Sequence, residues 1–429
     1  MKIIEQPDDM TLKAVLKRPY VKKELITADV SMILKKVQEG GDSAIIEFTN
    51  KFDGVEIKDI IVTRQEIETA IEEVPEALKM AISKSRRNIE KFHASQRVIE
   101  HKIETTPGVY CWRRSVPIEK VGIYIPGGSA PLFSTVLMLA IPARLAGCSQ
   151  IVLCSPPNQE GKIHPAILYA ADLIGVDLVV KAGGAQAIGA LAFGTESIPK
   201  VSKIFGPGNQ YVTKAKELIT TQGTAIDMPA GPSEVMVIAD KTANPDFVAI
   251  DLLSQAEHGP DSQVVLVATE REVANNVVKS LNTQIEALPR VSIATQAIDN
   301  SVAIITDEFK NILQIINRYA PEHLIINTEN AHKIADQVVN AGSIFIGPYS
   351  AESIGDYASG TNHTLPTNGY AAMYSGVSLD SFVKKITYQE VTAQGLKNIG
   401  PVVEEMAQAE SLMAHKRAVT IRLQSLKKE

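Results

Sequence analysis

Two hydrophobic patterns follow one another along the chain and predict two kinds of structure. Up to about residue 100, apolar residues recur three and four positions apart among Lys and Glu, for example in 29–38 and 64–96. This spacing is typical of amphipathic helices with one buried face. From Val121 to residue 347, short apolar runs alternate with helical stretches such as 272–288 and 307–319. The runs are VGIYIP, IVLCSP, DLVVKAGG, KIFGPG, EVMVIAD, VVLVAT, VAIIT, HLIIN and SIFIG.

These short runs predict the fold class. Uninterrupted apolar strands that alternate with helices indicate parallel sheets covered on both faces. The runs are too many for one small sheet, so we expect an α/β protein with two doubly wound, Rossmann-like units, 116–234 and 235–380. We expect 1–115 to be a helical region that packs with the second unit. The amphipathic stretch after Gly400-Pro401 predicts one helix, so 381–429 is expected to be a C-terminal helical arm.

The overall composition excludes several classes of protein. A chain of 429 residues with 45% hydrophobic and 21% charged residues is typical of a soluble protein with at least two domains. The net charge of -6 and the pI near 5.9 argue against nucleic acid as the main partner. The first ten residues do not resemble a signal peptide, and no apolar run is long enough to span a membrane. The 3 cysteines suit a reducing compartment, so we expect a cytoplasmic protein.

Three loops follow strands of the first predicted unit and are candidates for ligand binding. They are YIPGGSAPL, KAGGAQAIG and FGPGNQYV. Ligands of open parallel sheets bind beyond the carboxyl ends of the strands, where these loops would meet. The GxGxxG fingerprint is absent, although the GPGN turn exposes backbone N–H groups and Asn209 could cap the next helix. The loops could cradle a phosphate-containing cofactor or be ordinary turns, and their residues favour neither alternative.

One predicted helix carries a possible ligand pair at its end. Asn244-Pro245 predicts its start and Gly259-Pro260 its stop. Gln255 and His258 would project from one face of the last turn, which suits a metal or a polar ligand. A histidine favoured by the helix dipole beside a surface glutamine explains the pair equally simply. Taken alone, the pair favours that simpler explanation.

Two later stretches carry groups that could transfer protons or bind a ligand. In YAPEHLIIN, Glu322 and His323 are adjacent at the start of a strand, which places a carboxylate beside an imidazole. A loop pair that caps a helix is the alternative. In IGDYASGTNHTLPT, Asp356 and His363 lie in a segment rich in Gly, Ser and Thr, as in many binding loops. A long surface loop is the alternative there.

Two further stretches are weaker candidates. In AESLMAHK, Glu410 and His415 would point about 140° apart on one regular helix, so they form no site by themselves. They could share a site if the helix end frays or packs across a subunit boundary. In DMPAGPSEV, Ser233 could bind a polar ligand or be an ordinary turn serine. There is no GxSxG elbow, which argues against a hydrolase nucleophile.

The candidate residues together suit a metal centre. Nitrogen and oxygen donors without cysteine are typical ligands of Zn²⁺, or of Mn²⁺ where oxygen predominates. Neither HExxH nor CxxC is present.

The order and spacing of the motifs resemble one known family. FGPGN, DMPAGPSEV, SQAEHGPDSQ, APEHL, GDYASGTNH and AESLMAHK follow one another as in histidinol dehydrogenases, and the resemblance runs from about residue 25 to the end. It implies oxidation of L-histidinol to L-histidine by two NAD⁺ in succession, through an aldehyde-level intermediate. This reaction is the last step of histidine biosynthesis.

The resemblance also assigns roles to individual residues, with no departure at any of them. The family's acid/base pair matches Glu322 and His323. Its metal, usually zinc with manganese possible, would be held by Gln255, His258, Asp356 and His415. Substrate contacts match Ser233, His363 and Glu410, together with His323 and the metal ligands. Cofactor contacts match Tyr124, Gln186 and Asn209. The family is a homodimer whose C-terminal arm crosses to the partner, so His415 would come from the other chain.

A mechanism and three alternatives follow from these assignments. We expect His323 to take the alcohol proton in the first hydride transfer and Glu322 to activate water before the second. A cysteine thiohemiacetal would be a different route, but the neighbours of Cys154 offer no activating group and predict an inert buried thiol. A related enzyme for another small polyol or a sulfonated diol is the second alternative. A metal-dependent binding module without catalysis is the third, and it has no use for the Glu322-His323 pair.

Overall fold

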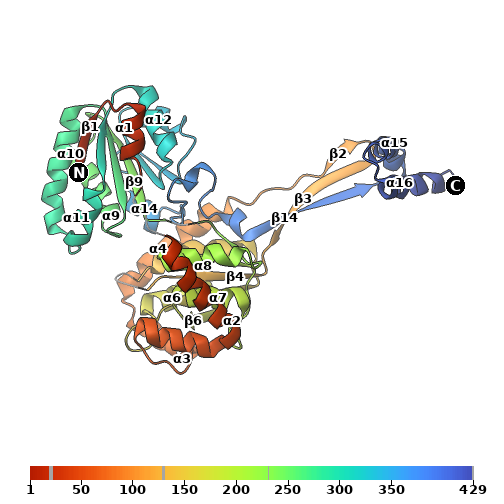
Figure 1. Ribbon diagram of the computed structural model, residues 1–429, viewed down its shortest axis with the longest axis horizontal. Coiled ribbons are helices and arrows are strands. Elements are labelled where there is room, and N and C mark those ends of the chain that lie inside the picture. Colours follow the sequence, from red (N-terminus) through yellow and green to blue (C-terminus); the bar gives the residue numbers. More distant parts are fainter. Residues whose placement is uncertain (19–22, 128–130, 230, 428–429) are drawn as a thin grey trace.

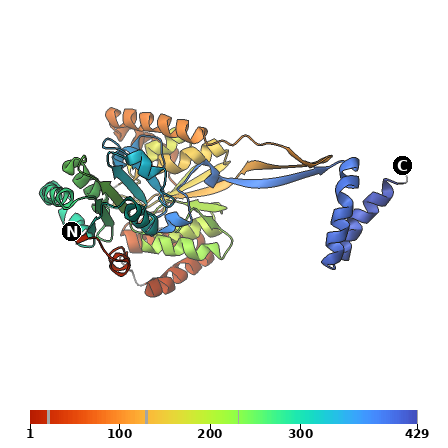
Figure 2. The same ribbon diagram turned by 90° about the horizontal axis from the view of Figure 1, so that it is seen from above.

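Two α/β lobes and a long projecting ribbon make up the molecule (Figures 1 and 2). The computed structural model describes residues 1–18, 23–127, 131–229 and 231–427. Each lobe is built on one parallel sheet, and the ribbon carries two helices away from both lobes (Figure 1). The predicted α/β class with two parallel units is confirmed. None of the described helices is long and apolar enough to cross a membrane.

The first lobe contains a five-stranded sheet in the order β6-β5-β4-β7-β8, with every neighbouring pair parallel. Its strands are β4 Lys120–Tyr124, β5 Gln150–Ser155, β6 Leu178–Lys181, β7 Lys203–Phe205 and β8 Ala225–Ile226. Its crossover helices are α5 Phe133–Ala146, α6 Pro165–Ile174, α7 Gly184–Phe193 and α8 Gln210–Thr220. The central strands are buried on both faces, as their continuous apolar runs predict.

The second lobe contains a six-stranded parallel sheet in the order β1-β11-β10-β9-β12-β13. Its strands are β1 Lys2–Glu5, β9 Glu234–Ala239, β10 Gln263–Ala268, β11 Val302–Ile305, β12 His323–Asn327 and β13 Ser343–Ile346. Its helices are α1 Asp9–Val15, α9 Pro245–Ala256, α10 Arg271–Gln284, α11 Val291–Asp299, α12 Phe309–Tyr319, α13 Ala331–Ala335 and α14 Glu352–Tyr357. Short 3₁₀ turns lie at Ile285–Ala287, Tyr370–Ala372 and Leu379–Phe382.

The sequence patterns located these elements well. All nine apolar runs between 121 and 347 are strands, and the helices predicted at 272–288 and 307–319 correspond to α10 and α12. The start of α9 follows its predicted cap, because the side chain of Asn244 accepts a hydrogen bond from Asp246 N at 2.9 Å. The same device opens α8, where Asn209 accepts hydrogen bonds from Tyr211 N and Val212 N at 3.0 and 3.1 Å.

The packing of the N-terminal helices differs from the prediction. We expected 1–115 to pack with the second unit, but α2 Lys23–Asp53, α3 Arg64–Glu73 and α4 Glu76–Ala94 cover the first lobe. Val30 and Leu34 of α2 share a hydrophobic core with Leu191 of α7. From this region β1 and α1 join the second lobe, where β1 adds an edge strand beside β11, and α4 also contacts that lobe through the hydrogen bond from Asn88 to Ala358 O. An amphipathic face shows that a helix is half-buried, but it does not name the surface that covers it.

The C-terminal arm stands on a ribbon that the sequence reading did not anticipate. The antiparallel strands β2 Ile103–Thr106, β3 Val109–Pro117 and β14 Val383–Val391 form the ribbon. At its tip lie α15 Ala393–Ala409 and α16 Met413–Ser425, far from both lobes in each view (Figures 1 and 2). We expected one helix after Gly400-Pro401, but the chain turns at Ser411, whose φ is 62°. The left-handed backbone of that residue ends α15 and allows α16 to fold back against it.

Candidate functional site

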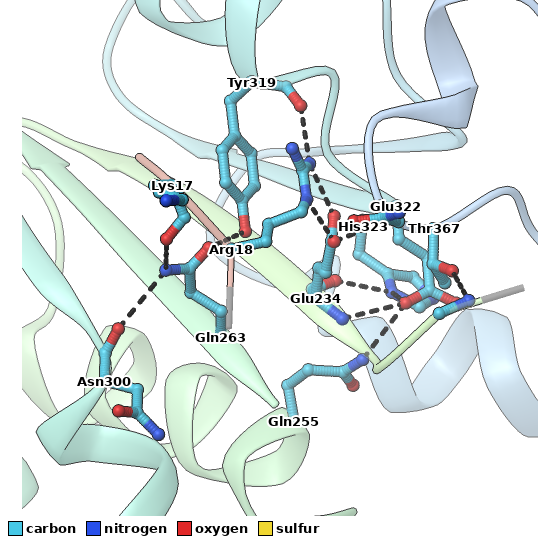
Figure 3. A network of polar contacts seen from close by, with 12 residues as sticks. Lys17, Arg18, Glu234, Gln255, Gln263, Asn300, Tyr319, Glu322, His323 and Thr367 are labelled. Carbon is cyan, nitrogen blue, oxygen red and sulfur yellow. Dashed lines mark hydrogen bonds and ion pairs between the residues drawn. The ribbon is translucent and has the colours of Figure 1, made fainter. Parts of the chain in front are cut away.

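The predicted acid/base pair lies at the amino edge of the six-stranded sheet. His323 opens β12 and pairs in register with Val235 of β9, so Glu322 and Glu234 lie at the same edge. The imidazole of His323 faces the carbonyl oxygen of Glu234, with Nδ1 3.2 Å away, and this contact assigns the ring proton to Nδ1. The carboxylate of Glu322 accepts a hydrogen bond from Glu234 N at 2.9 Å. One residue of β9 therefore holds both members of the pair through its main chain (Figure 3).

The end of α9 brings Gln255 into the same pocket. Its side chain is 1% exposed, and its Nε2 donates to Glu322 Oε2 at 3.5 Å. With the amide turned over, the nitrogen donates to Glu352 Oε1 at 2.6 Å and the oxygen accepts from Glu234 N at 3.0 Å. His258 differs from the prediction, because α9 ends at Ala256 and His258 lies in the turn beyond it, with part of its side chain in solvent and its ring facing the pocket charges. Partial burial lowers the pKa of His258, against the opposing charge of Asp356.

Helix α14 supplies two carboxylates, one of which the sequence reading missed. Asp356 Oδ1 lies 3.6 Å from His323 Nε2, and Glu352 Oε1 lies 3.9 Å from His323 Nδ1. Ligand atoms of His323, Glu352 and Asp356 all lie within 4.8 Å of one another. Glu352 was detectable in the sequence, because it precedes Asp356 by four positions and so shares its face of a helix.

Burial and charge alter the acid/base properties of this cluster. Burial raises the pKa of Glu322 to about 8, with His323 opposing the shift. Burial likewise raises the pKa of Glu352 to about 8. Burial alone would lower the pKa of His323, but Glu352, Glu322 and Asp356 outweigh it and raise the pKa well above 6.5. Burial opposes ionisation of Asp356, yet its contact with His323 lowers the pKa below 3.8. The three carboxyl groups around His323 thus favour the charged form of its imidazole.

The donor atoms in the pocket suit a divalent cation. Among the described residues, His323 Nε2 and Glu352 Oε2 are buried without a hydrogen-bond partner, as expected where a ligand completes a site. Nitrogen and oxygen donors around Asp356 match the preferences of zinc and manganese. Of the four expected ligands, Gln255 and Asp356 border this pocket, and His258 lies near enough for the charges of Asp356 and His323 to act on it. The fourth, His415, is exposed in α16 at the tip of the arm.

The expected substrate contacts lie in two places. His363 bridges the lobes, because its Nδ1 lies 2.9 Å from Asp356 O and its Nε2 lies 3.1 Å from Thr135 Oγ1 of α5. Ser233 is half-buried in the turn that leads into β9. Glu410 is exposed at the end of α15, on the same arm as His415. Within one chain, the arm residues are therefore separated from the pocket (Figure 1).

The expected cofactor residues lie at the carboxyl edge of the five-stranded sheet. Tyr124 ends β4, and its Oη accepts a hydrogen bond from Gly184 N at 3.1 Å. Gln186 lies in the first turn of α7 and is 1% exposed, while Asn209 caps α8 after β7. Apart from the bond to Tyr124, no described side chain caps the start of α7 after Gly183, so the other N–H groups of its first turn are available to an anion. Part of the YIPGGSAPL loop, 128–130, lies outside the described residues.

Cys154 has the environment of an inert thiol. Its side chain is completely buried in the core of the first lobe, and burial raises the pKa of the thiol far above its usual range. A thiol that stays protonated is a poor nucleophile. The geometry therefore agrees with the prediction that Cys154 is a packing residue.

Comparisons with known proteins identify the family. A family model described as histidinol dehydrogenase matches residues 16–423. Histidinol dehydrogenase of Bacteroides thetaiotaomicron is 56% identical over 427 residues, which cover 100% of this chain and 100% of the relative. That of Aliivibrio fischeri is 52% identical over 421 residues, 97% of this chain and 95% of the relative. The crystal structure of histidinol dehydrogenase from Elizabethkingia anophelis matches with a TM-score of 0.98 and 56% identity, covering 100% of this chain and 99% of that one. With such similarity along its whole length, the chain belongs to the histidinol dehydrogenase family.

Proposed function

We propose that this protein oxidises L-histidinol to L-histidine with two NAD⁺ in succession, the last step of histidine biosynthesis. Family membership supports the substrate and the overall reaction. The observation that carries the chemistry is the buried Glu322–His323 pair, held by the main chain of Glu234 beside Asp356. Two adjacent proton-transfer groups fit a reaction with two successive oxidations. A biosynthetic enzyme that consumes NAD⁺ would work in the cytoplasm.

In the first oxidation, His323 would take the proton of the substrate hydroxyl as hydride leaves the same carbon. Nε2 of the neutral ring would be the acceptor, because Nδ1 donates to the carbonyl oxygen of Glu234, and this neutral form increases with pH because the surrounding carboxylates raise the pKa of His323. In the second oxidation, Glu322 would take a proton from the water that adds to the aldehyde, and hydride then leaves the hydrated carbon. Glu322 is suited to this role because burial raises its pKa to about 8, close to the pH of the cell.

The pocket would hold a zinc-type ion, with manganese as the alternative. Gln255, His258 and Asp356 of one chain would bind it, together with His415 of the partner subunit. When bound, the ion would fix the imidazole and amine nitrogens of histidinol and offset the carboxylate charge around His323. The close grouping of His323, Glu352 and Asp356 supports a cation at this place. Ser233, His363 and the partner's Glu410 would contact the rest of the substrate.

NAD⁺ would bind at the carboxyl edge of the five-stranded sheet. Tyr124, Gln186 and Asn209 come from three different βα connections that meet at this edge. The start of α7 would face a phosphate group, since among the described side chains only that of Tyr124 accepts a hydrogen bond from its first N–H groups. His363 bonds to both Asp356 and Thr135, so it ties this lobe to the lobe that holds the acid/base pair.

A homodimer with a shared site explains the exposed arm. Met406 and Ile421 of the arm are 61% and 57% exposed. Exposed apolar side chains of this kind are typical of a surface that another chain covers. Ile354 and Tyr357 of α14, beside Asp356, are 50% and 55% exposed. Seating the partner's arm over α14 would cover both apolar surfaces. It would also bring the partner's His415 to the metal position.

The amount of NADH formed per histidinol supplied tests this function. We expect about two NADH per histidinol in a metal-replete assay, because alcohol-to-acid oxidation removes four electrons and each NAD⁺ accepts two. Histidine should be the product by amino-acid analysis. A ratio near one, with aldehyde released, would show that the protein is a simple alcohol dehydrogenase. No NADH from histidinol, with turnover of another polyol or a sulfonated diol, would overturn the substrate assignment.

A further inference from the structure

Arg18 reaches into the second lobe and pairs with a buried carboxylate. Its Nε and Nη2 donate to the two oxygens of Glu234, the second at 2.8 Å, and its Nη2 also donates to Tyr319 O at 2.6 Å. The guanidinium lies 4.0 Å from the centre of the Tyr319 ring (Figure 3). Such a bidentate, stacked arrangement suits arginine specifically, since lysine offers a single ammonium.

The partner of Arg18 is the residue that holds the acid/base pair. Glu234 uses its N–H for the carboxylate of Glu322 and its carbonyl for the imidazole of His323. Its side chain is fixed independently of these contacts, by Arg18 and by Asn368 N, which donates to Oε1 at 2.8 Å. The side chain thus sets the position of the first residue of β9, and the main chain passes that position to the site.

The ion pair is costly to break because it is buried. The side chain of Glu234 is 2% exposed and that of Arg18 is 18% exposed. Burial raises the pKa of Glu234, and Arg18 opposes that shift. Removing Arg18 would leave an unpaired carboxylate in the sheet, which would move or take up a proton. Either response would move the N–H and the carbonyl group of Glu234, which contact Glu322 and His323.

The N-terminal segment delivers Arg18 to this position. Leu12 and Leu16 of that segment are buried in the core of the second lobe. Gln263 holds the next part of the chain by donating to Lys17 O at 3.3 Å. The residues just before Arg18 are therefore anchored, although Arg18 belongs to none of the motifs that resemble the family.

We propose that Arg18 is a positioning residue for the reaction: by clamping Glu234, it fixes the N–H and the carbonyl that orient Glu322 and His323. This inference rests on the proposed roles of Glu322 and His323. It adds the N-terminal segment, through the Arg18–Glu234 pair, to the elements that the site requires.

Arg18→Met is the direct test, with Arg318→Met as its matched control. Arg318 pairs with Asp9 and also ties α1 to α12, but within the described part of the chain it forms no hydrogen bond or ion pair with Glu234, and its partner Asp9 is 58% exposed. We expect Arg18→Met to lower kcat for histidinol oxidation by up to about a hundredfold, as a misplacement of about 1 Å can do. KM for histidinol and NAD⁺, bound metal and the circular dichroism spectrum should stay close to wild type. Arg318→Met should keep the wild-type kcat.

Two more variants separate positioning from general stability. Arg18→Lys should recover only part of kcat, because one ammonium cannot replace the fork on both carboxylate oxygens. Arg18→Met/Glu234→Gln should be faster than Arg18→Met, since the unpaired charge is gone. The inference would be overturned if the two single substitutions lowered kcat by factors that multiply in the double variant. It would also be overturned if Arg18→Met and Arg318→Met lowered kcat equally.

A spectroscopic readout keeps this test independent of the reaction. The ¹⁵N signals of the His323 ring, assigned with a His323→Gln variant, report its orientation and hydrogen bonding. Arg18→Met should shift them and Arg318→Met should not. Unchanged signals in Arg18→Met would reject positioning even if histidinol proved to be the wrong substrate. A wild-type chain without NADH formation would reject the proposed function instead.

Discussion

Glu322 and His323 are neighbours in the chain, but distant residues set their properties. Glu234, which contacts both, lies 89 positions before His323, and Glu352 and Asp356 approach from another helix. The adjacent pair could be recognised from the sequence as two proton-transfer groups. Their raised pKa values could not, because burial and three converging carboxylates cause them.

Replacing the carboxylate of Glu322 separates the two oxidations. Glu322→Gln should form about one NADH per histidinol instead of about two, because the amide cannot take a proton from the attacking water. The aldehyde-level intermediate should be trapped by semicarbazide. Glu329→Gln, at an exposed site beyond β12, should behave as wild type. Histidine formed by Glu322→Gln at the normal rate would contradict this role.

The pH dependence of the second oxidation follows from the pKa of Glu322. Burial raises this pKa from 4.5 to about 8, so the carboxyl group is protonated below that pH and cannot act as a base. The rate of aldehyde oxidation should therefore rise with pH and level off above about pH 8. Stopped-flow measurement of NADH formation from the aldehyde checks this. A rate independent of pH across that range would show that another group takes the proton.

At the scale of elements, the ribbon is the feature that the sequence reading passed over. Strands β3 and β14 pair along their whole length, from Val383 opposite Pro117 to Val391 opposite Val109. Strand β14, VKKITYQEV, alternates apolar and polar residues only in part, and β3, VYCWRRSVP, begins with four apolar residues, so neither carries the clear alternation of a half-exposed strand. They are more than two hundred and fifty residues apart, as the pair Ser115 and Lys385 shows with a separation of 270. A pairing of that range cannot be read from either strand alone.

Mixing two inactive variants tests whether the arm crosses to a partner. Glu322→Gln damages the pocket of one chain and His415→Ala damages the arm of the other. After unfolding and refolding an equal mixture, about half of the dimers should be mixed, each with one intact site, so histidine formation should recover to about a quarter of wild type. Activity no higher than that of the separate variants, despite mixed dimers in a tag pull-down, would place each arm at its own chain's site.

At the scale of the molecule, the two lobes present opposite sheet edges to the proposed reaction. The first lobe offers the carboxyl edge of its sheet through Tyr124, and the second offers the amino edge through His323. His363 connects them by contacts to Asp356 and to Thr135. Ligands of open parallel sheets usually bind at the carboxyl ends of the strands, so the proposed site at the amino edge of the second sheet is an exception. Only the relative placement of the lobes makes this arrangement possible.

Removing the metal should lower the free energy of unfolding of the second lobe as well as the rate of the reaction. Without a cation, Glu322, Glu352 and Asp356 remain close together around one imidazole. A metal at about 100 times its Kd should raise the free energy of unfolding by about 2.7 kcal/mol. Dialysis against a chelator should therefore lower both Tm and activity, and zinc or manganese should restore both. Equal Tm and activity before and after chelation, with no metal left by mass spectrometry, would contradict a metal in this pocket.

The sequence by itself determined the features that depend on neighbouring residues. The nine strands of the apolar runs between 121 and 347, the caps of α8 and α9, the α/β class and the family motifs are all encoded within short segments. Hydrophobic periodicity and capping act over a few positions, so they can be read locally. The tertiary structure alone decided which lobe covers α2, how β3 finds β14, and that Glu352 and Arg18 join the site. Those features depend on contacts between surfaces far apart in the chain, and an apolar face or a charged residue does not specify its partner.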